Sequence, residues 1–289
     1  MLEANLYIIT SSDLIGNDMG FCQGLSHLGV VFAPIESYAI CGQSFFKIQI
    51  TYNPDSDKLL LAYLLTWARL YGWYIYRQKY KRPMVDIKFA AFDLDGTIIV
   101  NELMSDLAKA KGCSKDMNFL TEETMRGYLP FAESYRLRLK MLKGITYNDI
   151  KMVCTDIVFA SGFEHLFNYL KSKDVLMYLI TGGWSIFCDY VRETYPFDGY
   201  IASCPVFEND VFVGMCNEPL VDEEAKARFF SHILESHNIE ACDTFAMGDG
   251  ANDILMLSIS DHAFLYSAVA STHFSHIPID SFLAICREV

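Results

Sequence analysis

The sequence predicts an α/β protein built from a doubly wound parallel sheet with a helical cap insertion, preceded by a smaller βαββαβ unit. The chain has 289 residues, a length that suggests about two domains. Its second part alternates short apolar strands with helical segments, which is typical of a parallel sheet covered by helices on both faces. Its first part breaks this alternation, because two of its predicted strands follow one another with only a short turn between them.

The first unit spans residues 1–82 and is rich in strands with β-branched and aromatic residues. In chain order these strands are NLYIIT, VVFAPIESYAI, SFFKIQITY and WYIYRQ. Helices are predicted at residues 18–28 and 56–71, so the element order is that of ferredoxin-like modules. With the SDLIG turn before its first helix, the unit resembles the ACT domain family of amino-acid sensors. The resemblance implies that the unit binds an amino acid or pairs with a second copy in a homodimer, and a generic ferredoxin-like module is the alternative.

The second unit spans residues 86–289 and follows a polar linker, KYKRPMVD, that contains Pro83. Its predicted strands are KFAAFDLD, VLMYLITGG, GYIASC, TFAMGD and AFLY, which together favour a Rossmann-like sheet. Residues 101–161, directly after the first of these strands, are helical and poor in strand signals. They are therefore predicted to form a cap over the carboxyl edge of the sheet. The segment ASCPVFENDVFVGMC, residues 202–216, predicts a hairpin around END.

The composition narrows the functional classes and the location. Lysine and arginine total 23 against 36 aspartates and glutamates, a net charge of −13, which argues against binding to nucleic acid or to an anionic membrane. An anionic substrate stays possible, because a local cation can reverse the field. The nine cysteines show no C-x-x-C pair and the N-terminus has no basic signal region, so we expect a cytoplasmic protein with reduced thiols. The apolar stretch 59–76 contains Arg69 and Gly72, which favours an amphipathic helix and a strand over a membrane span.

Polar residues follow three of the predicted strands of the second unit, directly at their carboxyl ends. Ligands in open α/β sheets bind at these carboxyl ends. Asp93 and Asp95 lie two residues apart, so both carboxylates are expected on one side of their strand. Lys226 lies in a helical segment between the last two motifs. The strand-end groups are Asp93 and Asp95 in DLDGT, Thr181, Gly182 and Gly183 in LITGG, and Asp249, Asn252 and Asp253 in GDGAND.

Converging carboxylates need a cation, and an all-oxygen site with room for water suits Mg²⁺ shared with a substrate phosphate. Asp93, the backbone carbonyl of Asp95 and Asp249 could supply the protein ligands. An aspartate could then attack the phosphorus and form an aspartyl-phosphate. Asp95 could protonate the leaving oxygen and later deprotonate a water molecule. A calcium loop of the EF-hand type is excluded, because its required Gly and Glu positions hold Ile98 and Met104.

The remaining polar groups suit the oxygens of a phosphoryl group. These groups are the Thr181 hydroxyl, the amides of Gly182 and Gly183, and the ammonium of Lys226. Together and in this order, the motifs resemble the haloacid dehalogenase superfamily of phosphotransferases over about residues 86–289.

This resemblance implies a role for each acidic residue at the strand ends. Asp93 would be the nucleophile, and Asp95 would be the general acid and base. Mg²⁺ would be held by Asp93, Asp95 and Asp249. Asp253 would orient the water shell of the metal.

The predicted cap carries charged residues that bear on the choice of substrate. A helical spacing of about 100° per residue puts Arg136 on the solvent face and Arg138 roughly opposite, on the inner face. An inward arginine needs an anionic partner, which a substrate carboxylate could provide. Glu102 could hold a substrate ammonium. Together with a phosphate site beside them, these residues predict a phosphorylated amino acid as the substrate. For each residue taken alone, an internal salt bridge or a surface charge is the alternative.

The segments DLDGTIIVNE, TMRGYLPFAESYRLRLKMLKG and GDGANDILML resemble the phosphoserine phosphatase family. The resemblance implies that Glu102 contacts the substrate amino group and that Arg138 contacts its carboxylate. Met125 and Phe131 would close the pocket with apolar side chains. Asn252 would lie beside the phosphate.

The activity implied by this resemblance is Mg²⁺-dependent hydrolysis of O-phospho-L-serine to L-serine and phosphate through an aspartyl-phosphate, the last step of serine biosynthesis. L-Serine or another amino acid would be the ligand of the first unit. Two alternatives stay open. One is a phosphatase for another small metabolite, such as phosphohomoserine or a sugar phosphate. The other is an amino-acid-sensing regulatory protein with secondary phosphatase activity.

Overall fold

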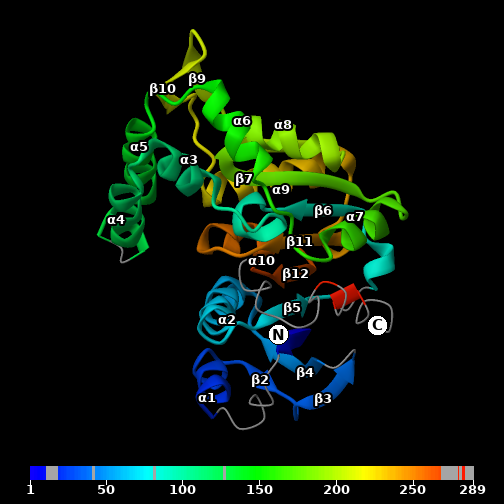
Figure 1. The fold of residues 1–289 in the computed structure, drawn as a ribbon. Coiled ribbons are helices and arrows are strands. Elements are labelled where there is room, and N and C mark those ends of the chain that lie inside the picture. Colours follow the sequence, from blue (N-terminus) through cyan, green and yellow to red (C-terminus); the bar gives the residue numbers. More distant parts are fainter. Residues whose placement is uncertain are drawn as a thin grey trace.

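The computed structural model describes residues 1–10, 19–40, 43–80, 83–125, 128–267, 279 and 282–283. At residues 19, 38–40, 43–45, 121–122, 124–125 and 131 only the backbone is described. The chain is organised around one continuous sheet that runs through both predicted units, and a group of helices projects from one side of it (Figure 1).

The elements of the first unit follow the predicted order, with one change in the second strand. They are β1 (Leu2–Thr10), α1 (Met19–His27), β2 (Val31–Phe32), β3 (Glu36–Ile40), β4 (Gln43–Tyr52), α2 (Asp57–Tyr71) and β5 (Tyr74–Gln78). Strands β3, β4, β1 and β5 lie side by side in this order and every pairing is antiparallel, which is the ferredoxin-like arrangement. The single strand expected at 30–40 is split into β2 and β3 around Pro34, because proline has no N–H to donate to the ladder.

The second unit contains the parallel sheet that the sequence predicts. Its strands are β6 (Phe89–Phe92), β7 (Leu176–Trp184), β8 (Gly199–Ser203), β11 (Thr244–Gly248) and β12 (His262–Leu265). One face is covered by α7 (Phe163–Lys171) and α8 (Ser185–Thr194), and the other by α9 (Glu223–His237) and α10 (Ile254–Ile259). Side chains along β6 alternate between the two faces of the sheet. Ala90 and Phe92 are buried in one core, and Phe89 and Ala91 in the other.

The insertion after β6 is helical, as predicted, and forms most of the projecting cap (Figure 1). Its helices are α3 (Leu103–Lys111), α4 (Ser114–Met125), α5 (Phe131–Met141) and α6 (Tyr147–Thr155). The predicted hairpin is present as β9 (Pro205–Glu208) and β10 (Val211–Cys216). Asn209 and Asp210 make its turn at φ values of 49° and 64°, which polar residues of this kind tolerate. The hairpin pairs with the cap, since the Gly144 N–H donates to the Phe212 carbonyl at 2.8 Å.

The predicted boundary between the two units is not a break in the sheet. β5 of the first unit pairs antiparallel with β12 of the second, which gives the order β2-β4-β1-β5-β12-β11-β6-β7-β8. The fully buried Arg77 of β5 crosses this junction and donates to the carbonyls of Leu257 at 2.7 Å and Ser260 at 3.1 Å. The pairing also covers an edge of β12 that would otherwise expose unpaired backbone groups.

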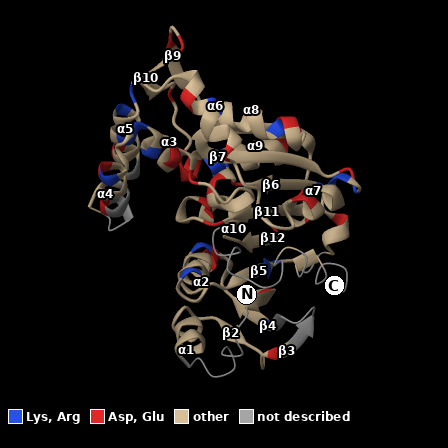
Figure 2. Cartoon of the chain, viewed as in Figure 1, with Lys and Arg blue, Asp and Glu red and all other residues tan. Residues whose placement is uncertain are grey.

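Charged residues of both signs lie mainly on the helices and loops around the largely uncharged strands (Figure 2). Within the described ranges, none of the helices joins the length to the apolarity that a membrane crossing requires. The seven cysteines in these ranges are free thiols.

Candidate active site

The carboxyl end of β6 places the first of the predicted site residues. Asp93 leaves the strand, donates its backbone N–H to the Met247 carbonyl of β11 at 3.0 Å, and is 4% exposed. The chain then turns through Leu94–Ile98 with Gly96 at φ +67°. A Cβ at Gly96 would lie 2.8 Å from Oδ2 of Asp249. Both the left-handed backbone and the close carboxylate therefore require glycine at this position.

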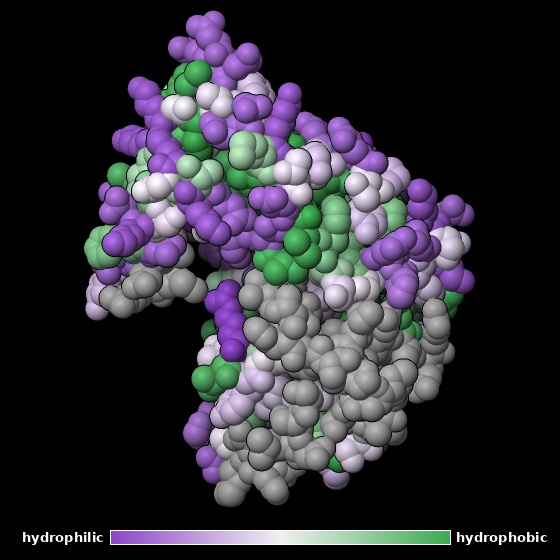
Figure 3. Space-filling view, in the orientation of Figure 1, coloured by the Kyte–Doolittle hydropathy of each residue, from purple (hydrophilic) through white to green (hydrophobic). Residues whose placement is uncertain are grey.

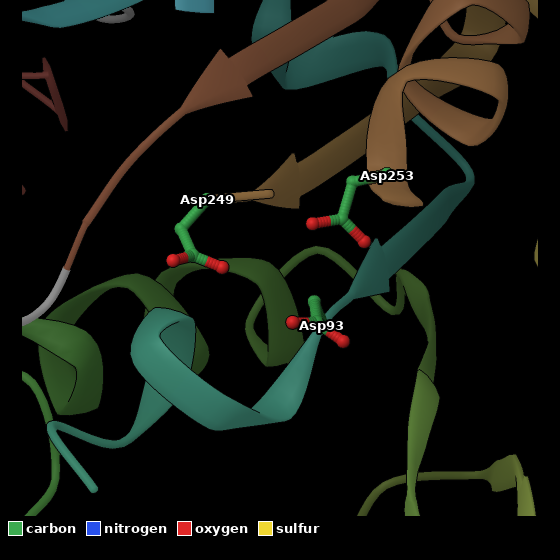
Figure 4. Close-up of side chains that lie close together, drawn as sticks. All are labelled: Asp93, Asp249 and Asp253. Atoms are coloured by element: carbon green, nitrogen blue, oxygen red, sulfur yellow. The ribbon is translucent and has the colours of Figure 1, made fainter. Parts of the chain in front are cut away.

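Three carboxylates converge at this edge of the sheet (Figure 4). Asp93, Asp249 and Asp253 each offer an oxygen within 4.8 Å of the others, from the ends of β6 and β11 and the start of α10. Burial and the charge of Asp253 raise the pKa of Asp93 to about 7. Burial and the charges of Asp93 and Asp253 likewise raise the pKa of Asp249. An all-oxygen cluster with excess negative charge fits a divalent cation such as Mg²⁺.

Lys226 of α9 is the predicted cation of the site and is fully buried. Its ammonium donates to Oδ1 of Asp93 at 2.6 Å and to Oδ1 of Asp253 at 2.7 Å. Burial lowers the pKa of Lys226, but the charges of these two aspartates outweigh burial and raise the pKa above its usual value. The other oxygen of Asp253 accepts the Gly250 N–H at 2.9 Å. Because both its oxygens have partners, Asp253 is better suited to the predicted position behind the metal than to direct ligation.

Asp95 is half-buried and lies between the sheet edge and the cap. Its Oδ1 accepts the N–H of Leu103, the first residue of α3, at 2.8 Å. A Cβ at Gly183 would come within 2.9 Å of its Oδ2, so the carboxylate also lies against the second motif. Burial raises the pKa of Asp95 to about 7, although the hydrogen bond from Leu103 opposes the shift. A carboxyl group with such a pKa can donate and accept a proton near neutral pH.

The second motif lies at the end of β7, where the pairing with β8 becomes irregular between Ile180 and Trp184. Thr181 is 1% exposed, and its hydroxyl oxygen accepts the Gly183 N–H at 2.9 Å. Helix α8 begins directly afterwards, at Ser185. The Thr181 hydroxyl and the backbone of Gly182 and Gly183 thus lie just before the N-terminus of α8. The Gly183 amide is hydrogen-bonded to Thr181.

Glu102 and Arg138 bring opposite charges to the site from the cap. Glu102 immediately precedes α3, and its Oε1 would lie 3.1 Å from a Cβ at Gly96. Desolvation by the walls of the site, with the charges of Asp95 and Asp106, raises the pKa of Glu102 to about 7. Arg138 of α5 opposes this rise, and burial lowers the pKa of Arg138 itself. The two side chains are therefore close enough to interact electrostatically.

The remaining predicted residues are described to different extents. Arg136 lies on the outer face of α5, as the helical spacing predicts, and pairs with Glu218 at 2.9 Å on the surface. Asn252 is half-buried and folds back against Gly250. The side chains of Met125 and Phe131 lie outside the described part of the chain, so their contacts with substrate stay predictions.

Tyr135 of α5 is a site residue that the sequence analysis missed. It is 4% exposed, and its hydroxyl donates to the Gly182 carbonyl at 2.8 Å. The Arg138 guanidinium lies over its ring, 5.5 Å from the ring centre. Tyr135 therefore ties the cap to the second motif and supports Arg138. Its spacing of three from Arg138 is a signal that could have found it, because residues three apart share a helix face.

Arg69 is a second residue that the sequence analysis did not connect with the site. It lies in the last turn of α2, in the first unit, and its Nη2 donates to the Asp249 carbonyl at 3.2 Å. The two residues are 180 positions apart. Periodicity in the segment around Arg69 predicts only an amphipathic helix, so no local signal could have revealed this contact.

A profile of the haloacid dehalogenase-like hydrolases matches residues 90–258, the range that contains the motifs at the sheet edge. The chain belongs to this family. Among curated relatives of this haloacid dehalogenase-like hydrolase, the phosphoserine phosphatase of Archaeoglobus fulgidus is 28% identical over 201 residues, which cover 70% of the chain and 58% of the relative. The probable phosphoserine phosphatase of Schizosaccharomyces pombe is 30% identical over 183 residues, which cover 63% and 61%. The chain thus spans about three fifths of the length of these relatives.

Solved structures show the same fold. A phosphoserine phosphatase that carries an analogue of the phospho-aspartyl intermediate is 27% identical, with a TM-score of 0.57 over 61% of this chain and 84% of its own. A haloacid dehalogenase-family hydrolase from Salmonella enterica is 23% identical, with a TM-score of 0.65 over 90% of this chain and 87% of its own. The second likeness extends the shared fold over most of the molecule.

Proposed function

We propose that this hydrolase is an Mg²⁺-dependent phosphoserine phosphatase that works through an aspartyl-phosphate. The proposal is supported by the Asp93–Lys226 pair at the sheet edge and by the Glu102–Arg138 pair of the cap, since Oε1 of Glu102 lies at Gly96 beside Asp249 and the charge of Arg138 acts on Glu102. The first pair suits a phosphoryl group, and the second suits the ammonium and the carboxylate of an amino acid. The phosphoserine phosphatases among its relatives support the same substrate.

The proposed reaction uses Asp93 and Asp95 in turn. A carboxylate oxygen of Asp93 attacks the phosphorus, and the bond from phosphorus to the serine oxygen breaks. Asp95 gives its proton to that leaving oxygen, so L-serine departs with its hydroxyl restored. Asp95 then takes a proton from water, the water oxygen attacks the phosphorus, and the bond to Asp93 breaks to release phosphate. The pKa of Asp95, about 7, suits both proton transfers.

Charge compensation is the second requirement of this chemistry. Mg²⁺, held by Asp93, the carbonyl of Asp95 and Asp249, would offset the negative charge that substrate and carboxylates bring together. The convergence of carboxylates and the raised pKa of Asp93 support such a site. Lys226 would keep Asp93 in place. The Thr181 hydroxyl and the Gly182 amide would bind phosphoryl oxygens, whereas the Gly183 amide donates to Thr181.

Recognition of the amino-acid part would come mainly from the cap. Glu102 would bind the ammonium, and Arg138 would hold the carboxylate in a fork of two hydrogen bonds. Tyr135 would keep Arg138 oriented through its ring. Met125 and Phe131 would close the pocket.

A panel of phosphate monoesters tests the proposal. Purified protein with Mg²⁺ should release phosphate from O-phospho-L-serine with a far higher kcat/KM than from phosphohomoserine or sugar phosphates. Equal rates across the panel would overturn the substrate assignment. D93N should lower the rate by at least about 10⁴-fold, because the nucleophile is lost. D116N, an exposed aspartate of α4, is the matched control and should keep the wild-type rate.

A further inference from the structure

Helix α2 brings the first unit against the active site. It packs on α10, the helix that follows the GDGAND loop, and both lie towards the side from which the cap projects (Figure 1). The Nη2 of Arg69, in the last turn of α2, donates to the backbone carbonyl of Asp249 at 3.2 Å. This contact places a guanidinium group from the first unit next to the carboxylate cluster.

Glu102 of the cap borders the same part of the site. A Cβ at Gly96 would come within 2.8 Å of Oδ2 of Asp249 and 3.1 Å of Oε1 of Glu102, so both carboxylates border the space beside Gly96. The charge of Arg69 acts on Glu102 and opposes the rise in its pKa. Arg138 acts on Glu102 in the same way. The charges of two guanidinium groups, one from the cap and one from the first unit, therefore both reach Glu102.

Arg69 can still bind a ligand. A guanidinium has five N–H donors, and towards the described residues Arg69 makes the one hydrogen bond to Asp249. Its side chain is exposed. The surface is hollowed between the cap and α2 (Figure 3), so there is room beside this helix for a small molecule that approaches the sheet edge.

We propose that Arg69 is a specificity-determining residue of the active site that binds the carboxylate end of a phosphorylated amino acid together with Arg138. The inference rests on the proposed function. The site gathers carboxylates that repel an anionic substrate, and a second guanidinium offsets this repulsion at the amino-acid end. The planar fork of arginine is suited to a carboxylate, because it can donate two parallel hydrogen bonds. The first unit is then part of the substrate site.

Two substrates separate this role from a purely structural one. O-Phosphoethanolamine has the phosphate and the ammonium of O-phospho-L-serine but lacks the carboxylate. R69Q removes the charge and keeps an amide donor for the Asp249 carbonyl. In the full chain with Mg²⁺, R69Q should raise KM for phosphoserine about tenfold at an unchanged kcat, as the loss of one charge-assisted contact predicts. The constants for phosphoethanolamine, measured as KM or as a competitive inhibition constant, should change less than about twofold.

The control is K58Q, which removes an exposed charge from the same helix about three turns away. It should leave both substrates unchanged. If R69Q does not fold, R69K serves instead and should show a smaller loss confined to phosphoserine. Equal losses for the two substrates would overturn the inference and assign Arg69 to holding the Asp249 loop, and wild-type constants would overturn it as well. If the wild-type protein does not hydrolyse phosphoserine, the proposed function fails first and this inference falls with it.

Discussion

The active site and the junction between β5 and β12 both bury charged groups, but the balance of charge differs between them. At the active site, a single buried cation, Lys226, is shared by two aspartates. At the junction, two cations meet two carboxylates. Arg77 and Lys79 lie 3.4 Å and 3.1 Å from Asp57. The fully buried Asp261 lies next to them, and its carbonyl accepts the Lys79 N–H at 3.0 Å. Arg77 is as fully buried as Lys226, so depth alone does not distinguish the two regions.

The balance of charge indicates what each region does. At the junction the protein itself balances the buried cations, through Asp57 and Asp261. The carbonyls of Leu257 and Ser260 accept further hydrogen bonds from Arg77. At the active site the surplus is negative, and burial together with the charge of Asp253 keeps the pKa of Asp93 at about 7 even beside Lys226. A negatively charged cluster that nearby protein groups do not neutralise needs a cation from solution, whereas a cluster with balanced charges holds the fold together.

Among the variants that compare these two regions, K226M should have the largest effect, because it removes the only charge that the two aspartates share in the described structure. Methionine keeps much of the volume but leaves Asp93 and Asp253 buried without their cation. We expect kcat/KM for phosphoserine to fall about 10³-fold and the metal-free protein to unfold at a lower temperature. R228M, which changes an exposed arginine of the same helix, is the control. Wild-type rates in K226M would mean that Lys226 only fills space.

R77M should change stability rather than chemistry. Removing one partner of the buried cluster is expected to lower the free energy of unfolding by about 3 kcal/mol. The kcat of the folded protein should stay near wild type, because Arg77 lies away from the carboxylate cluster. Urea denaturation and initial rates would be measured side by side, and R228M should change stability by less than about 0.5 kcal/mol. A large fall in kcat with full stability would contradict the structural role of the junction.

The raised pKa values of the site predict how the metal-free protein responds to pH. Asp93 and Asp95 titrate at about 7 in the folded protein, against an ordinary value of 3.8. Between about pH 4 and pH 7 the folded state therefore binds more protons than the unfolded chain, so the free energy of unfolding falls as pH rises. In EDTA the unfolding midpoint should decrease more steeply over this range in wild type than in D95N, and Mg²⁺ should flatten the decrease. Parallel curves for the two proteins would argue against the raised pKa of Asp95.

Y135F should have the smallest effect, because it removes one hydroxyl and leaves the charges intact. The lost hydrogen bond to the Gly182 carbonyl is expected to cost about 1 kcal/mol, or about fivefold in kcat/KM, if it holds the cap against the second motif. Y128F changes an exposed tyrosine of the cap and should be neutral. Identical kinetics for Y135F and wild type would show that ring packing alone supports Arg138.

The strand-end residues were predictable because their placement depends on short-range rules. Alternation along β6 and the parallel pairing of β6 with β7 and β11 bring the carboxyl ends of these strands to one edge. Asp93, Asp249 and Asp253 meet there for that reason. The split of the second strand at Pro34 was equally local, and the absence of an N–H in proline was a signal that the prediction of one strand at 30–40 passed over.

Tyr135 and Arg69 were not predictable in the same way, because each contact depends on how two separate elements pack. The Tyr135 hydroxyl reaches Gly182 only because the cap packs against the end of β7. Arg69 reaches Asp249 only because α2 packs on α10. In both cases the acceptor is a backbone carbonyl, a group that every residue carries, so side-chain identity does not reveal the partner.

The sequence by itself determined the α/β class, the helical insertion and the acidic strand ends, since these follow from local periodicity and from the spacing of a few polar residues. The tertiary structure alone decided that β5 joins β12 in one sheet, and that the first unit delivers Arg69 to the edge of the active site. Strand pairing and helix packing between distant segments are selected by shape and burial across the whole molecule. A residue pattern confined to one segment does not encode that choice.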